Sequence, residues 1–126
     1  MRLKRLGQLS GEMEWAVNEI LLVYRSRTSA LWARVADLQR VGGHLSVQDS
    51  AWLIDAGHRY DEWAHWAKQD ALQVGINSHS LILDVFNDNL TLGDCDTMLR
   101  RRKGTAKAII ERGLKRYALL AGRVAA

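Results

Sequence analysis

The sequence predicts an all-α protein, a compact bundle of five or six helices. Proline, the strongest helix breaker, is absent from all 126 residues. Apolar residues recur at intervals of three and four along most of the chain, the spacing of one helix face, and glycines interrupt these stripes. Alternating patterns typical of strands are weak throughout.

Length and composition indicate a single domain, residues 1–126. A chain of this length can bury about two thirds of its unfolded surface, and 48% hydrophobic with 25% charged residues is the composition of a globular protein. No apolar run approaches the roughly 20 residues of a membrane span, and no signal-peptide core follows the basic N-terminus. With a single cysteine there is no internal disulfide. We expect a cytoplasmic protein without membrane contacts and without a cofactor.

The first part, residues 1–45, is predicted to form one long helix, or two helices broken near Arg27–Thr28, that ends at Gly42–Gly43. Its apolar stripe consists of Met13, Val17, Ile20, Tyr24, Leu31, Val35 and Leu38. The stripe has two interpretations. It either faces the core of one monomer or, since its spacing is close to a heptad, forms the seam of a homodimer or a partner contact.

The central part, residues 46–90, is predicted to contain several helices. Ser46–Asp49 resembles a capping box, and Gly57 can end the helix that follows. The next helix ends at Gly75, and its apolar face consists of Tyr60, Trp63, Ala64, Ala67, Ala71 and Val74. A short helix follows, capped by Asn77 or Ser78. Its apolar residues are Leu81, Ile82, Val85 and Phe86.

The last part, residues 91–122, has the pattern of a helix-turn-helix. Thr91 and Asp94 form a capping-box pattern before a short helix at Leu92–Leu99, and the run Arg100–Lys103 follows. A second helix ends at Gly122. Its apolar stripe consists of Ala106, Ile109, Ile110, Gly113, Leu114, Tyr117 and Ala121. Cys95, Leu99, Ala106 and Ile109 can supply the helix crossing.

Charge is unevenly distributed and indicates a polyanionic partner. Residues 94–126 hold nine cations and three anions, a net charge of +6, whereas residues 1–93 carry −2. We therefore expect duplex DNA as a partner, with lysine and arginine contacting phosphates or guanine edges and Gly104 permitting close backbone approach. The candidate DNA-binding residues are Arg100, Arg101, Arg102, Lys103, Gly104, Thr105, Lys107, Ala108, Lys115 and Arg116. We expect the face of Arg102, Lys103 and Lys107 to be open to solvent and without acidic cover; pairing of these cations with Glu111, Asp94 or Asp96 would count against DNA. Ile109, Ile110 and Leu114 should be largely buried.

The segment TLGDCDTMLRRRKGTAKAIIERGLKRY resembles, without gaps, the helix-turn-helix of sigma-factor region 4 over about 27 residues. The matching positions are Thr91, Asp94, Leu99, Gly104, Thr105, Ala106, Lys107, Lys115 and Arg116. Three positions depart from the family pattern. Asp96 stands where alanine is usual, at a packing position, Arg100 stands at the turn glycine, and Arg102 replaces a capping serine.

A second segment, DEWAHWA at Asp61–Ala67, resembles the Trp-x-x-Trp-Ala segment of the short lambdoid-phage antitermination Q proteins. In that family the segment lies farther from a similar helix-turn-helix than it does here. The resemblance implies a transcription regulator that binds promoter-proximal DNA and acts with RNA polymerase. The N-terminal helices would then carry dimer or polymerase contacts.

Two rival functions remain open. The chain has features of a helical protein-interaction module, such as a phage-type inhibitor of a host protein. It is also compatible with a small terminase-like DNA-packaging subunit. We do not expect an enzyme, because no phosphate loop, serine elbow or catalytic carboxylate pair is recognisable.

Several other residues have simpler roles. His58, Glu62 and His65 share a helical face, but no second cluster completes a metal site, so we predict a solvated face. Cys95 is predicted to be a buried structural thiol. The tryptophans are interpreted as core or interface residues rather than stacking platforms for single strands. They are Trp15, Trp32, Trp52, Trp63 and Trp66.

Overall fold

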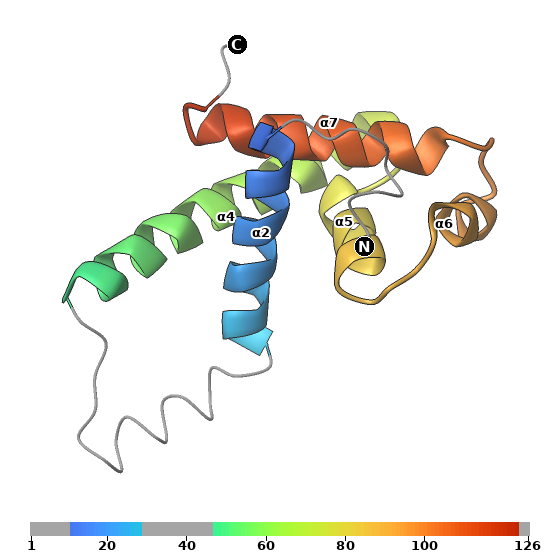
Figure 1. The fold of residues 1–126 in the computed structure, drawn as a ribbon. Coiled ribbons are helices and arrows are strands. Elements are labelled where there is room, and N and C mark those ends of the chain that lie inside the picture. Colours follow the sequence, from blue (N-terminus) through green and yellow to red (C-terminus); the bar gives the residue numbers. More distant parts are fainter. Residues whose placement is uncertain (1–10, 29–46, 124–126) are drawn as a thin grey trace.

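The structure is a computed structural model that describes residues 11–28 and 47–123. All regular secondary structure in these residues is helical, which confirms the all-α prediction (Figure 1). The helices are α2 (Gly11–Thr28), α4 (Val47–Val74), α5 (Ser78–Phe86), α6 (Leu92–Met98) and α7 (Thr105–Leu120).

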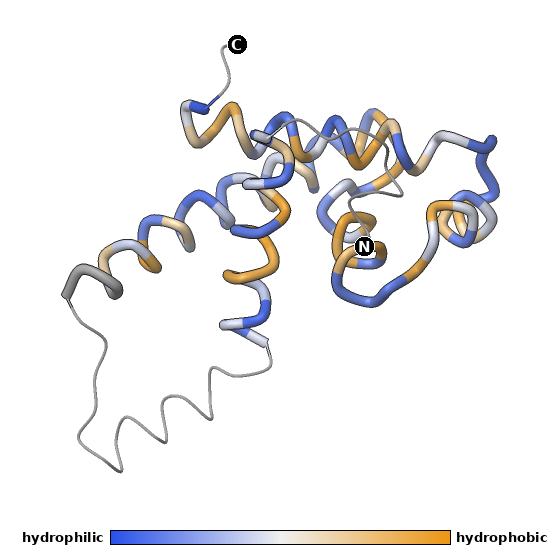
Figure 2. Tube along the Cα trace, in the orientation of Figure 1, coloured by the Kyte–Doolittle hydropathy of each residue, from blue (hydrophilic) through white to orange (hydrophobic). Residues whose placement is uncertain are grey.

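Helix α7 is the central element, because it packs against each of the other four helices. It runs across the top of Figure 1, with α2 and α4 leading away from it and α6 lying near its N-terminal end. Along α7 hydrophilic and hydrophobic residues alternate in short groups, as expected for a helix with one buried face (Figure 2). None of the helices in the described residues is long and apolar enough to cross a membrane.

The core lies where α2, α4, α5 and α7 meet. Trp63 and Tyr117 are its largest fully buried side chains, and their rings meet edge to face with centroids 5.4 Å apart. The Trp63 indole also donates a hydrogen bond of 2.9 Å to the carbonyl oxygen of Gly113. At this point α7 lies close to α5, since a Cβ atom on Gly113 would lie 2.8 Å from the Cβ atom of Ser78.

A buried polar cluster joins three helices inside this core. The carboxylate of Glu19 on α2, whose side chain is 3% exposed, accepts two hydrogen bonds from the guanidinium of Arg59 on α4, at 2.8 and 2.7 Å. The hydroxyl of Tyr117 on α7 donates to the same carboxylate. Burial of a charge is unfavourable unless it is paired and hydrogen-bonded. The cluster therefore stabilises only the arrangement in which these three helices cross here.

The stripe predicted for the first helix is confirmed in the described part. Met13, Val17 and Ile20 are buried, Tyr24 is partly buried, and α2 ends at Thr28. Some predicted features lie outside the described residues. They are Leu31, Val35, Leu38, Trp32, the Gly42–Gly43 terminus and Ser46 of the predicted capping box.

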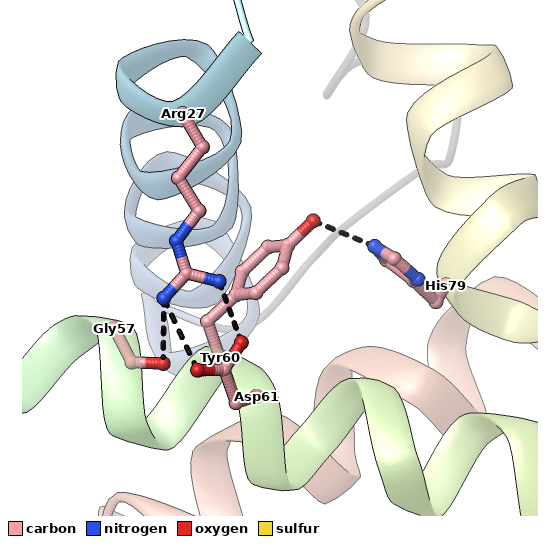
Figure 3. Close-up of polar contacts among 5 residues, drawn as sticks. All are labelled: Arg27, Gly57, Tyr60, Asp61 and His79. Atoms are coloured by element: carbon pink, nitrogen blue, oxygen red, sulfur yellow. Dashed lines mark hydrogen bonds and ion pairs between the residues drawn. The ribbon is translucent and has the colours of Figure 1, made fainter. Parts of the chain in front are cut away.

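Gly57 does not end a helix, contrary to the prediction, because α4 continues through it to Val74. Its role is steric. A Cβ atom on Gly57 would lie 2.9 Å from an Nη atom of Arg27, and the same nitrogen donates to the Gly57 carbonyl oxygen at 3.3 Å. Figure 3 shows this guanidinium of α2 lying over Gly57 and pairing with Asp61. The glycine permits close approach of a side chain rather than a turn of the backbone.

Figure 3 also shows how α4 meets α5 beside this contact. The Tyr60 hydroxyl and His79 Nε2 are 2.6 Å apart, and their rings meet edge to face. Burial lowers the pKa of His79, since the charged imidazolium would lose its hydration. Burial raises the pKa of Tyr60 to about 12 for the same reason. The pair is therefore a neutral hydrogen bond at physiological pH.

The other predicted helix ends are confirmed. Gly75, with φ of +86°, follows the last residue of α4. The side chain of Asn77 caps α5 by accepting from two backbone N–H groups of its first turn. Thr91 and Asp94 form a reciprocal capping box at the start of α6. These ends place α6 and α7 next to each other at one side of the core.

Candidate nucleic-acid interface

At the end of α6 the backbone turns out of the helix, although no glycine stands at the turn. Arg100 is in the left-handed conformation, with φ of +54°. Its N–H donates to the carbonyl oxygen of Thr97 at 3.1 Å, and the N–H of Arg101 donates to that of Asp96 at 3.0 Å. These two bonds form a Schellman motif, in which the left-handed residue is usually glycine. Arg100 thus adopts a conformation that usually belongs to glycine, at the conformational cost of an L side chain.

The start of α7 is capped from a distance. Gly104 is its N-cap residue, with φ of +93° and no side chain to accept a hydrogen bond. Asp96 of α6 supplies the cap instead, because its carboxylate oxygens accept from the N–H groups of Gly104 at 3.0 Å and Ala106 at 2.8 Å. An acidic residue at this packing position, where alanine is usual, is therefore compatible with the fold. Asp96 is buried, but its charge is hydrogen-bonded at the positive end of a helix.

Arg102, which replaces the capping serine of the family pattern, is not the N-cap residue of α7. Its carbonyl oxygen accepts from the N–H of Thr105 at 3.1 Å, and its side chain is exposed. Sequence reasoning had not assigned the cap to Asp96. The available signal was that no Ser, Thr, Asp or Asn stands between α6 and Thr105 to cap the helix locally.

The predicted contact between α6 and α7 is present. Cys95 and Ala106 are fully buried, and burial raises the pKa of the Cys95 thiol. Leu99 packs against the core at its edge. Ile109 is also at this edge, partly buried and packed against the core. Ile110 and Leu114 are fully buried, as expected.

The four cations between the helices, Arg100–Lys103, are called the basic turn here. All four side chains are exposed. No ion pair joins any of them to another residue of the described ranges. Arg101 lies across the C-terminal end of α4, because a Cβ atom on Gly75 would be 3.1 Å from its Nη2. A guanidinium is favourable beside the negative end of a helix dipole.

The other predicted DNA-binding residues divide into an open and a packed group. Gly104, Lys107, Ala108 and Lys115 are exposed, and Thr105 is partly buried. The Lys107 ammonium lies 3.9 Å from the carboxylate of Glu111, a separation at which an exposed pair contributes little. Contrary to expectation, Lys107 thus has an acidic neighbour, although so weak a pair leaves it available for another contact.

Arg116 belongs to the packed group. Its guanidinium carbon lies 5.5 Å from the ring centroid of Trp66 on α4, and its side chain is only partly exposed. The neighbouring Arg112 forms two hydrogen bonds to Asp70, at 3.0 and 2.6 Å, which lower the pKa of that carboxyl. The open basic surface consequently lies at the N-terminal end of α7, with Lys115 farther along, rather than over the whole helix.

The remaining predictions concern the face of His58, Glu62 and His65 and the tryptophans. His58, Glu62 and His65 are exposed, and within residues 11–28 and 47–123 no group of three His, Cys, Asp or Glu could hold a metal. Among the tryptophans, Trp63 is a core residue and Trp52 is exposed. Trp15 and Trp66 pack against the core at its edge.

Comparisons of this chain with models of protein families, with curated proteins and with solved structures yield no match. Neither resemblance noted in the sequence is therefore supported or opposed by a relative. What the protein does has to be inferred from its residues and their geometry.

Proposed function

We propose that this protein binds duplex DNA through α6 and α7 and regulates transcription. The observation that carries the proposal is the basic turn, whose four exposed cations have no described carboxylate partner and directly precede α7. Cations in this state can exchange hydration and counterions for phosphates without first breaking an ion pair. Two cations farther along α7 are less available, since Arg112 is paired with Asp70 and Arg116 lies on Trp66.

The backbone around the basic turn supports a helix-turn-helix mode of binding. In that mode the first helix crosses the phosphate backbone and the N-terminal residues of the second helix reach base edges in the major groove. Here α7 buries Ala106, Ile110 and Leu114 against the core and exposes Lys107 and Ala108 in its first turn. Lys107 has the chemistry to donate to guanine, and Ala108 to contact a thymine methyl group.

The resemblances extend this proposal to a partner. A region-4-like helix-turn-helix next to a Trp-x-x-Trp-Ala segment implies an antitermination factor that acts with RNA polymerase in a bacterial cytoplasm. On that basis α2 and α4 would contact polymerase or a second copy of the chain.

Specific observations on α2 and α4 also favour a second candidate, a protein-interaction module. Trp52 and Ile54 are 46% and 58% exposed. Next to them a cleft of about 330 Å³ between α2 and α4 is lined by apolar residues such as Val23 and Leu53 and bordered by Arg27 and Asp61. Exposed apolar patches of this kind occur at protein contact sites. We favour DNA binding because it accounts for the unpaired basic turn.

The deciding experiment is selection of bound duplexes from a random pool, followed by titration of the selected duplex at several salt concentrations. A triple variant with Arg100, Arg101 and Lys103 changed to alanine should flatten the slope of log affinity against log salt by about 0.9 per lost phosphate contact. The matched control removes three cations from α2, from α4 and beyond α7, by changing Arg25, Lys68 and Arg123 to alanine. It has the same net charge. Equal slopes for the two variants, or no duplex retarded at low salt, would contradict DNA binding at this surface.

A single variant then separates base contact from phosphate contact. If Lys107 contacts a base edge, Lys107→Ala should relax the preference at one position of the selected sequence by roughly 1–3 kcal/mol. Affinities for duplexes that differ only at that position measure this effect. A uniform loss on all of them assigns Lys107 to a phosphate.

A further inference from the structure

Asp96 makes hydrogen bonds to three backbone N–H groups across the connection between α6 and α7. Its main-chain carbonyl oxygen accepts from Arg101 at 3.0 Å, at the beginning of the connection. Its carboxylate accepts from Gly104 and Ala106, at the beginning of α7. One residue of α6 thereby determines both how the chain leaves α6 and where α7 starts.

This arrangement determines the position of the first turn of α7. The two carboxylate oxygens bind separate N–H groups, so a shift or a rotation of α7 relative to α6 would lengthen at least one hydrogen bond. Asp96 is only 7% exposed, and water can therefore not replace a lost bond easily. Gly104 has no side chain with which to cap the helix in its place. The direction in which Lys103, Lys107 and Ala108 leave the backbone consequently depends on Asp96.

The carboxylate of Asp96 also has an electrostatic effect, and this effect opposes DNA binding. The N-terminus of a helix is a natural site for a phosphate, because its free N–H groups and its dipole attract an anion. Asp96 already occupies two of these N–H groups with its own negative charge. Phosphates near α7 must then be bound by the side chains of the basic turn. By charge alone, Asp96 weakens the attraction of DNA.

We propose that Asp96 is a positioning residue, which holds the first turn of α7 in the orientation required for sequence-specific contact at the cost of non-specific attraction. This inference rests on the proposed function, DNA binding by α6 and α7. In this proposal the position of α7 determines the affinity for the correct sequence. The charge of the basic turn determines the affinity for any sequence.

The opposite signs of the two effects provide the test. Asp96→Asn and Glu111→Gln each remove one negative charge near the N-terminal half of α7, but Glu111 is not bonded to the connection. Glu111→Gln should strengthen binding to selected and scrambled duplexes alike, by a few-fold. Asp96→Asn should likewise strengthen binding to the scrambled duplex, yet weaken binding to the selected duplex at least tenfold. Equal strengthening of both duplexes by both variants would overturn the positioning role.

Asp96→Glu provides a second variant that keeps the charge. The extra methylene displaces the carboxylate, so that it cannot accept from both N–H groups with the backbone in the same position. Binding to the selected duplex should therefore fall, while binding to the scrambled duplex stays unchanged. A role limited to charge predicts no change on either duplex, and that result would also overturn the proposal.

Amide hydrogen exchange in the free protein separates this inference from the proposed function. The N–H groups of Gly104 and Ala106 should exchange slowly in the wild type and at least tenfold faster in Asp96→Asn, measured by NMR below the melting temperature of the variant. Fast exchange of both in the wild type would show that Asp96 does not hold the turn. If the wild type binds no duplex while this protection is observed, DNA binding fails and the structural role of Asp96 remains.

Discussion

Arginines in two regions of this protein have opposite surroundings. At the crossings of α2, α4 and α7, Arg27, Arg59 and Arg112 each form an ion pair with a carboxylate on another helix. In the basic turn no such pair exists among the described residues, and all four residues are exposed, although Arg101 lies against the C-terminal end of α4. Cations of the first kind hold helices together, whereas those of the second kind leave charge available to a partner. A high local count of cations therefore overstates the surface available for binding.

The largest expected effect distinguishes a paired arginine from an unpaired one. Arg59→Ala would leave the nearly buried carboxylate of Glu19 without its guanidinium, and loss of one partner of a buried pair costs about 3–5 kcal/mol. Arg102→Ala in the basic turn should change the free energy of unfolding by less than about 0.5 kcal/mol. Urea unfolding of both variants measures the difference. Comparable losses would mean that the two regions do not differ in the way described.

The second prediction concerns how tightly the crossing region is packed. In Gly113→Ala the new methyl group would lie 2.8 Å from the Cβ atom of Ser78, whose position is fixed by the backbone of α5. We expect a loss of about 1–3 kcal/mol in the free energy of unfolding, despite the better helix propensity of alanine.

Gly57→Ala is the matched control for this change, since it also adds a methyl group inside a helix. There the new atom meets only the end of the Arg27 side chain, which can move away. We expect a change within about 1 kcal/mol of the wild type, in either direction. Equal losses in the two variants would show that the crossing of α5 and α7 is not closely packed.

A third prediction uses pH to compare the same two regions. The Arg112 guanidinium holds the pKa of Asp70 below its usual range, so the folded state binds this proton less readily than the unfolded state. The pair therefore stabilises the fold above pH ~4, and its contribution is lost as the pH falls through the pKa of Asp70 in the folded state. Because Arg112 is half exposed but the Asp70 side chain is only 8% exposed, Arg112→Gln should cost about 1–2 kcal/mol at pH 6. This cost should be smaller at pH 3 than at pH 6, measured by urea unfolding. For Arg101→Gln, any cost should be the same at both pH values.

The smallest expected effect has opposite signs for stability and for binding. Arg100→Gly removes an L side chain from a left-handed conformation, and should raise the free energy of unfolding by about 0.5–1 kcal/mol. The same change removes one cation of the basic turn and should weaken binding to duplex DNA. Thermal unfolding and a binding titration measure the two effects. A variant that is less stable would contradict the assigned turn conformation.

Local features of this fold were predictable because they depend on neighbours in the sequence. The capping box of Thr91 and Asp94, the cap at Asn77 and the end of α4 at Gly75 each involve groups within a few residues of one another. The core stripe of α7 was predictable from its period, because a helix with one apolar face has to bury that face. The basic turn was predictable as a run of charge. Sequence alone could not show that its charges are unpaired.

The sequence by itself determined the all-α class, the helix ends named above and the presence of a basic turn before an amphipathic helix. Only the tertiary structure decided which cations are available, why Gly57 lies within a helix and why Asp96 is compatible with a buried position. The physical reason is the same in each case. The partners are Asp70 for Arg112, Arg27 for Gly57, and the first turn of α7 for Asp96. These groups come from different helices and meet only after those helices have packed.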